Sequence, residues 1–125
     1  MKKIFILLSF VFSFSAFGQA GDDQIVNSLK KANAAQFSNY FDSFIDLKLP
    51  EKDEIKNVSK TQATITVKSF FEENKINGFN LTSQREMQGT MYVTGKLTGE
   101  SGNFNLTVIM KNKGDHPSII TVRIN

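Results

Sequence analysis

Beyond residue 21, apolar positions recur with the spacing of an α-helix. Asp22 and Asp23 are good N-cap residues. The apolar residues that follow at offsets of four and seven, and so share one helix face, are Ile25, Leu29 and Ala32. Asn33, with Gln36 three positions later, gives a second capping pattern before three aromatic residues on one face, Phe37, Tyr40 and Phe41. The pattern predicts a helix that kinks or restarts at Asn33.

The hydrophobic period changes to two over residues 44–49. One side of this segment carries Ile45, Leu47 and Leu49, and the other carries Phe44, Asp46 and Lys48. This alternation predicts a half-buried strand, which Pro50 ends because proline cannot donate to a β-ladder. Residues 51–57 are charged, with Ile55 as their apolar anchor, and predict a loop.

Two patterns compete over residues 59–71. Ser59 and Gln62 have the spacing of a capping box, and the apolar residues at helical offsets are Ala63, Val67, Phe70 and Phe71. The β-branched run at residues 64–67 favours a strand instead. We predict a helix, because the cap and the paired phenylalanines agree.

The last part of the chain alternates with the period of strands. The predicted strands are residues 79–86, 90–98, 103–111 and 118–124, and each gap between them carries Gly, Asn, Asp or Pro. Such short gaps favour hairpins, so the strands should form an antiparallel meander. The inward-facing sets are Met91, Val93, Gly95 and Leu97, then Phe104, Leu106, Val108 and Met110. Helices first and strands afterwards predict an α+β fold, with the N-terminal helices packed on one face of a strongly curved antiparallel sheet.

The first 18 residues have the features of a signal peptide. Met1, Lys2 and Lys3 form a basic start, and a largely apolar run over residues 4–14 is too short to span a bilayer. The small residues Ser15, Ala16 and Gly18 place the cleavage between Gly18 and Gln19. We therefore expect an exported protein, periplasmic or extracellular, with one domain at residues 19–125 and no membrane anchor after cleavage.

Charge and cysteine content exclude several classes of function. Removal of Lys2 and Lys3 leaves 13 basic residues against 12 acidic ones, so the mature net charge is about +1 and gives no reason to expect nucleic-acid binding. The chain has no cysteine, which excludes disulfides, thiolate metal sites, cysteine nucleophiles and a lipid-modified cysteine. A domain of this size must then be held by its core alone.

Several short segments resemble a known family. They are Tyr40-Phe41-Asp42, Leu47-Lys48-Leu49-Pro50, Ser59-Lys60-Thr61-Gln62-Ala63, Phe70-Phe71, Gly95, Gly102-Asn103-Phe104 and residues 119–124. The chain is similar in these segments to a family of small exported Bacteroidota proteins catalogued as domain of unknown function 4783. The resemblance implies a cystatin-like cone of the nuclear transport factor 2-like type, and it implies no activity. Val58 stands where the family often has tyrosine, and the loop at residues 51–56 is not glycine-rich.

We predict no catalytic residue, no metal site and no cofactor. His116 is the one histidine, so it is the one candidate base for a serine nucleophile, and its place beside Pro117 predicts a solvated turn residue instead. One imidazole and no thiolate do not make a zinc site. Asp42 and Asp46 lie four residues apart, but they have no evident neighbour to tune them as an acid–base pair.

The aromatic residues are the more informative feature. In a cone such rings fill the core or line a pocket, and filling the core is the default expectation. The alternative is a hydrophobic cavity in which two tyrosines offer polar handles to a small ligand. The candidate ligand-binding residues are Tyr40, Phe44, Phe71 and Tyr92.

These observations predict a non-enzymatic exported domain that binds a small apolar ligand or a protein partner. The alternative is an enzyme of the isomerase or dehydratase kind found on cone folds, using an aspartate and a tyrosine. A further alternative is a homodimer formed through the polar face of one strand, which carries Thr90, Tyr92, Thr94, Lys96 and Thr98.

Overall fold

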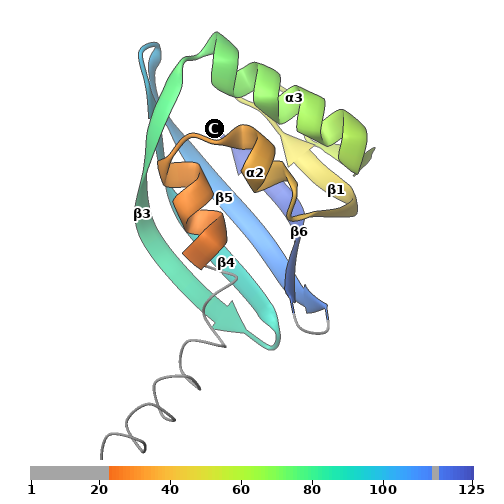
Figure 1. Ribbon diagram of the computed structural model, residues 1–125. Helices are drawn as coiled ribbons and strands as arrows, with labels where there is room; N and C mark the ends of the chain where they lie inside the picture. Colours follow the sequence, from red (N-terminus) through yellow and green to blue (C-terminus); the bar gives the residue numbers. More distant parts are fainter. Residues whose placement is uncertain (1–22, 114–115) are drawn as a thin grey trace, which may run out of the picture.

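The computed structural model describes residues 23–113 and 116–125 and folds them as a six-stranded sheet with three helices. The elements are a helix at residues 23–30, α2 (Ala34–Ser38), β1 (Phe41–Lys48), β2 (Ile55–Ser59), α3 (Lys60–Glu73), β3 (Ile76–Met87), β4 (Thr90–Gly99), β5 (Gly102–Lys113) and β6 (His116–Ile124). Figure 1 shows a bent sheet with the helices drawn on one side of it. The predicted signal peptide at residues 1–18, its cleavage site and Asp22 lie outside the described residues.

The sheet is mixed, in the order β2-β1-β6-β5-β4-β3. The meander of β3, β4, β5 and β6 is antiparallel as predicted, and each of its strands is longer than its alternating pattern. The prediction of a wholly antiparallel sheet is wrong, because β1 pairs with β6 in parallel. β1 and β6 are far apart in the sequence, so no hairpin joins them. The pattern of turn residues therefore does not indicate their relative direction.

The hairpin between β3 and β4 shows how local sequence sets the register. Gln88 has φ 53° and Gly89 has φ 80°. Two consecutive positive φ values are typical of a type I′ turn, whose twist matches that of the strands it joins. Met87 therefore pairs with Thr90, and this register holds as far as the pair of Ser83 with Thr94, beyond which it shifts between Ser83 and Leu81.

The predicted helix restart at Asn33 is confirmed. Ala32 has φ 55°, which ends the first helix, and the Asn33 side chain accepts a 3.0 Å hydrogen bond from the Gln36 amide as the N-cap of α2. The placement of Phe41 on the same helix face as Phe37 is wrong, because α2 ends at Ser38 and Phe41 begins β1. The two rings still pack edge to face, 5.4 Å apart.

The helical prediction for residues 59–71 is confirmed. Ser59 is the N-cap of α3, and its side chain accepts a hydrogen bond from the Gln62 amide at 3.3 Å. The buried residues of α3 are Ala63, Val67, Phe70 and Phe71, as the helical offsets predict. The Gln62 side chain does not complete the predicted capping box, because its Nε2 donates to Thr66 Oγ1 at 3.5 Å. The Ser59 cap and the core-facing stripe together outweigh the β-propensity of residues 64–67.

The prediction of a loop over residues 51–57 is partly wrong, because β2 begins at Ile55. This strand lies at the edge of the sheet and pairs only with β1. Its residues are exposed except for Val58, which is half-buried. An edge strand that is solvated on both faces has no apolar alternation, so the hydrophobic pattern does not reveal it.

One cluster of buried apolar residues joins the helices to the sheet. It includes Ile25 and Leu29 from the first helix, Phe37 from α2, Val67 from α3, and residues of every strand except β2. The predicted inward sets are confirmed: Val93, Gly95, Leu97, Leu106, Val108 and Met110 are buried, and Met91 and Phe104 are half-buried. The space between helices and sheet is therefore filled with side chains, and the hollows described next open at the surface.

Candidate functional site

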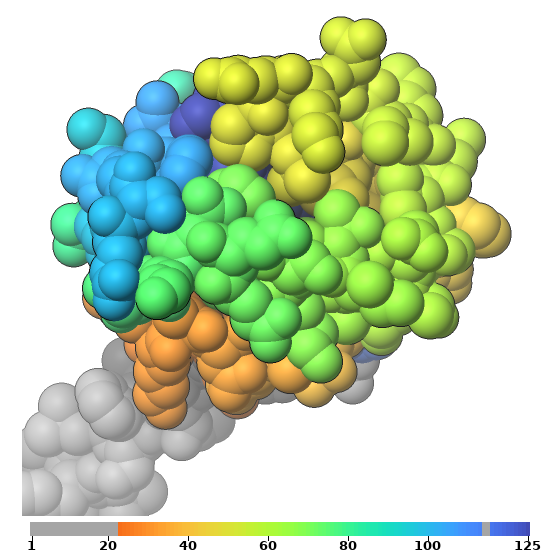
Figure 2. Space-filling view, turned by 90° about the horizontal axis from the view of Figure 1, so that it is seen from above, coloured from red at the N-terminus to blue at the C-terminus, as the bar shows by residue number. Residues whose placement is uncertain are grey.

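Two hollows of similar size lie on opposite sides of α3. Figure 2 shows α3, in green, between the N-terminal helices in orange and the segment that joins β1 to β2 in yellow. We name the hollow on the yellow side the α3 groove; its volume is about 590 Å³. It is lined by Leu49, Pro50, Glu51, Lys52, Gln62, Ile65, Thr66, Ser69, Phe70, Glu73, Asn74 and Phe104.

The walls of the α3 groove come from three parts of the chain. The α3 residues that line it follow the helical spacing of one face. On the opposite wall, the chain turns after β1 with a 3.2 Å hydrogen bond from the Lys52 amide to the Leu49 carbonyl. Below these walls Phe104, from β5, packs edge to face on Phe70 at 5.1 Å.

The apolar part of the α3 groove is accessible. Ile65 is 54% exposed although it is a large aliphatic residue, and Leu49, Pro50 and Phe104 are half-buried. A bound molecule would remove this apolar surface from water, which favours binding.

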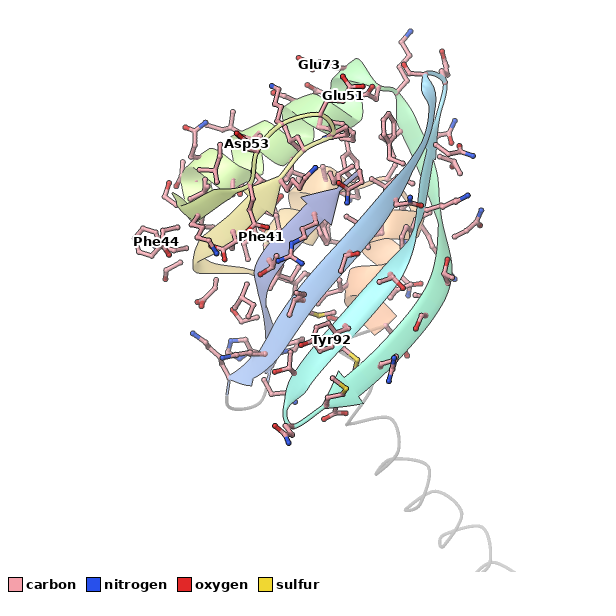
Figure 3. The ribbon with its side chains drawn as sticks, turned by 180° about the vertical axis from the view of Figure 1, so that it is seen from behind. Phe41, Phe44, Glu51, Asp53, Glu73 and Tyr92 are labelled. Atoms are coloured by element: carbon pink, nitrogen blue, oxygen red, sulfur yellow. The ribbon has the colours of Figure 1, made fainter. Side chains whose placement is uncertain are left out.

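The charges of the α3 groove are carried by Glu51, Glu73 and Lys52, all exposed. Glu51 comes from the β1–β2 segment and Glu73 from the end of α3, and both line the groove (Figure 3). Among the described residues, neither glutamate forms an ion pair within 4.0 Å. Nearby Glu54 differs, because Arg123 binds its carboxylate at 2.8 Å and holds its pKa below the usual value.

The second hollow has the opposite charge. We name it the N-terminal hollow; its volume is about 570 Å³. Three lysines line it, Lys31, Lys68 and Lys75, against one carboxylate, Glu72. Lys75 is 3.9 Å from Glu100, and both side chains are mostly exposed, so this pair neutralises the hollow only weakly.

The four candidate ligand-binding residues lie in different places. Phe71 is a buried core residue at the edge of the N-terminal hollow. Tyr40 is half-buried, and its hydroxyl donates to Gln24 Oε1 at 2.8 Å. Phe44 is 59% exposed and projects from β1, while Tyr92 lies on the outer face of β4 (Figure 3). Their role in ligand binding stays a prediction.

The face of β4 that carries Tyr92 has a third, smaller hollow of about 300 Å³. It is lined by Ser83, Arg85, Met87, Tyr92 and Thr94, from the paired strands β3 and β4. Met87 is 50% exposed there. This is part of the sheet face that the sequence suggests for a homodimer.

The candidate acid–base residues are engaged in ion pairs and hydrogen bonds. Lys113 binds Asp42 at 2.8 Å and, with the Ser43 amide, holds the pKa of that carboxyl below its usual value. Asp46 accepts a 3.1 Å hydrogen bond from the Asn57 amide and lies 3.9 Å from Lys56. The ion pairs of Asp42 and Asp46 are partly exposed surface contacts, which contribute modestly to the stability of the fold.

His116 and metal binding are the remaining candidate chemistry of the chain. His116 is exposed as predicted, but its placement in a turn is wrong, because it is the first residue of β6. Over residues 23–113 and 116–125, no group of three or more His, Asp or Glu side chains is arranged to hold a metal ion. In the same residues, no helix has the length and hydropathy needed to cross a bilayer.

Comparison with known proteins places the chain in a family. A crystal structure of a DUF4783 family protein from Bacteroides ovatus is similar, with 27% identity and a TM-score of 0.75 over 81% of this chain and 90% of that one. A cystatin fold protein from Novosphingobium aromaticivorans (9% identity, TM-score 0.62, 85% and 95% of the two chains) and an NTF2-like protein of unknown function from Cytophaga hutchinsonii (6%, 0.56, 82% of each) share the fold. No curated protein matches the sequence. The sequence pattern of the family described as domain of unknown function (DUF4783) matches residues 22–125, and the chain belongs to this family.

Proposed function

We propose that this chain is a non-enzymatic binding domain that holds a small, largely apolar ligand in the α3 groove. The observation that carries the proposal is the accessible apolar surface of the groove, with Ile65 54% exposed beside Phe70 and Phe104. Its volume of about 590 Å³ lies within the range of about 300–1,000 Å³ that is typical of small-molecule sites. In this proposal the helices pack on one face of the curved sheet and fill the interior of the cone. The ligand therefore binds at the edge of the cone.

The proposed place of action is outside the cytoplasm, in the periplasm or beyond the cell. The support is in the sequence of residues 1–18, which has the features of a cleavable signal peptide. A domain without cysteine gains nothing from an oxidising compartment, so the core described above supplies its stability.

The enzymatic alternative has less support. A carboxylate that acts as a general base near neutral pH usually has a raised pKa, whereas Lys113 lowers the pKa of Asp42. Tyr40, the tyrosine nearest in sequence, directs its hydroxyl to Gln24. An acid–base pair of Asp42 and Tyr40 would have to break both of these contacts before it could act.

The binding proposal is tested with an uncharged probe and two matched isoleucine variants. Residues 19–125, labelled with ¹⁵N, are titrated with 4-phenylbutanol and followed by two-dimensional NMR. We expect shifts for groove residues and a loss of about fivefold in affinity in Ile65→Ser, because that variant removes apolar surface from the site. Ile55→Ser is the control, since Ile55 is 61% exposed and does not line the groove.

Two results contradict the proposal. One is the absence of groove shifts at millimolar 4-phenylbutanol. The other is an equal loss of affinity in Ile65→Ser and Ile55→Ser, which would mean that exposed apolar residues bind the probe wherever they lie.

A further inference from the structure

We infer that the ligand of the α3 groove carries a positive charge beside its apolar part, as an organic ammonium compound does. This inference rests on the proposed function and adds the chemical class of the ligand. It comes from the carboxylates at the rim of the groove and from the contrast with the N-terminal hollow.

Two carboxylates face the same space from different parts of the chain. Glu51 belongs to the segment after β1, and Glu73 is the last residue of α3; both line the groove (Figure 3). In the described part of the chain no cation lies within 4.0 Å of either one. Glu51 and Glu73 outnumber Lys52, so the rim of the groove is net negative, and it lies beside the apolar residues of the groove.

Two other carboxylates around the β1–β2 segment, Glu54 and Asp46, have partners from the protein, whereas exposed Asp53, like Glu51 and Glu73, has no ion pair within 4.0 Å among the described residues. Glu54 binds Arg123 at 2.8 Å and lies 3.6 Å from Lys56. Asp46 also lies 3.9 Å from Lys56. Glu51 and Glu73 differ from Asp53 in that they line the groove, where a bound cation would give them the partner that Glu54 already has.

The N-terminal hollow shows that the charge of the groove is a local property. Its three lysines against one glutamate attract anions, although it is as large as the groove and only one helix away. An anionic ligand would find better electrostatics there than in the α3 groove. The two sides of α3 thus favour ligands of opposite charge.

Adjacent residues of α3 supply a matched test of this inference. Glu73 lines the groove and Glu72 lines the N-terminal hollow, and both are exposed. Glu73→Gln and Glu72→Gln remove the same charge from the same helix end. Glu73→Gln changes the rim of the groove, whereas Glu72→Gln changes the other side of α3.

The experiment compares three probes with one apolar part: 4-phenylbutylammonium, 4-phenylbutanol and 4-phenylbutanoate. Dissociation constants for the groove are measured by NMR titration at pH 7 and low salt. We expect the ammonium probe to bind about fivefold tighter than the alcohol, because the two exposed glutamates attract it. The carboxylate probe should bind more weakly than the alcohol, because the same glutamates repel it. Glu73→Gln should reduce the preference, the double variant Glu51→Gln/Glu73→Gln should abolish it, and Glu72→Gln should leave it unchanged. In 1 M NaCl the preference should disappear, because salt screens exposed charges.

The outcomes separate this inference from the proposed function. Equal binding of the three probes in the groove, or an equal effect of Glu72→Gln and Glu73→Gln, overturns the inference and leaves the groove as a site for neutral apolar ligands. No groove binding of any probe overturns both.

Discussion

Gly95 in β4 occupies a position that no side chain fits. It is buried on the inner face of the sheet, opposite Leu81 of β3. A Cβ at this residue would lie 2.5 and 2.6 Å from Cζ and Cε1 of Phe79, and it would also clash with the backbone carbonyl oxygen of Asn80. The Phe79 ring covers the glycine from the neighbouring strand, an arrangement that supports glycines in curved sheets.

We therefore expect Gly95→Ala to destabilise the domain by about 3 kcal/mol. Overpacking of a core costs about 1–3 kcal/mol, and the upper end applies because one of the clashing atoms is a strand carbonyl that side-chain rotation cannot move. The melting temperature should fall by about 10–20 °C for a domain of this size. The free energy of unfolding is measured by urea denaturation of residues 19–125, with the m-value checked for two-state behaviour.

Gly78→Ala is the control for this prediction. A Cβ at Gly78 would lie 2.9 Å from Thr98 Oγ1, which can rotate away by giving up its 3.1 Å hydrogen bond to Asn77 Oδ1. Its cost should stay below about 1 kcal/mol. A Gly95→Ala variant within about 0.5 kcal/mol of the wild type, or no more affected than Gly78→Ala, would refute the reasoning.

Two further predictions concern charge and assembly. Lys113 lowers the pKa of Asp42 below 3.8, so this pair stabilises the folded chain at neutral pH and the contribution is lost as the pH falls through the lowered value. Asp42→Asn should cost less than about 1 kcal/mol at pH 7, since the pair is partly exposed. The difference in urea denaturation should shrink as the pH falls through the lowered pKa of Asp42, and a difference that does not change with pH would contradict the assignment. If the outer face of β4 forms a homodimer, light scattering of residues 19–125 should give twice the monomer mass and Tyr92→Asp should halve it, whereas a monomeric wild type at high concentration removes the idea.

The parts of the fold that sequence predicts well are those where a local signal and burial agree. Asn33 and Ser59 cap the helices they were expected to cap. The strands β3 to β6 follow because alternation marks their buried face and short gaps set their direction. At α3 the local β-propensity of residues 64–67 points the wrong way, and the helical spacing of the buried residues decides the outcome.

The parts that sequence misses depend on strand pairing that no local pattern marks. β2 is an edge strand whose five residues bury no side chain fully, so its register with β1 leaves no periodic trace. The parallel pairing of β1 and β6 joins residues 75 to 78 positions apart and includes a register shift between Phe41 and Asp46. Such contacts follow from the packing of the whole domain and not from any short segment.

The candidate site was harder to predict than the fold. Aromatic content pointed to Tyr40, Phe44, Phe71 and Tyr92, but side chains of one type need not share a surface, and these four come from different faces of the molecule. The groove combines Phe104 from β5 with α3 and with the segment after β1, and only the folded chain brings these together. One signal was present in the sequence: Ile65 is apolar yet lies off the helix face formed by Ala63, Val67, Phe70 and Phe71.

The opposite charges on the two sides of α3 follow from the helix period. Among the residues of α3, 62, 65, 66, 69, 70 and 73 line the groove, and 68, 71 and 72 line the N-terminal hollow. Members of each set lie three or four residues apart, which is the spacing of one side of a helix. Neighbouring residues on a helix point about 100° apart, which sends Glu72 and Glu73 to different sides although they are adjacent in the chain. One helix thus presents a core face and two surfaces of different electrostatic character. The charge of each surface can be changed at a single residue without disturbing the buried stripe that holds α3 on the domain.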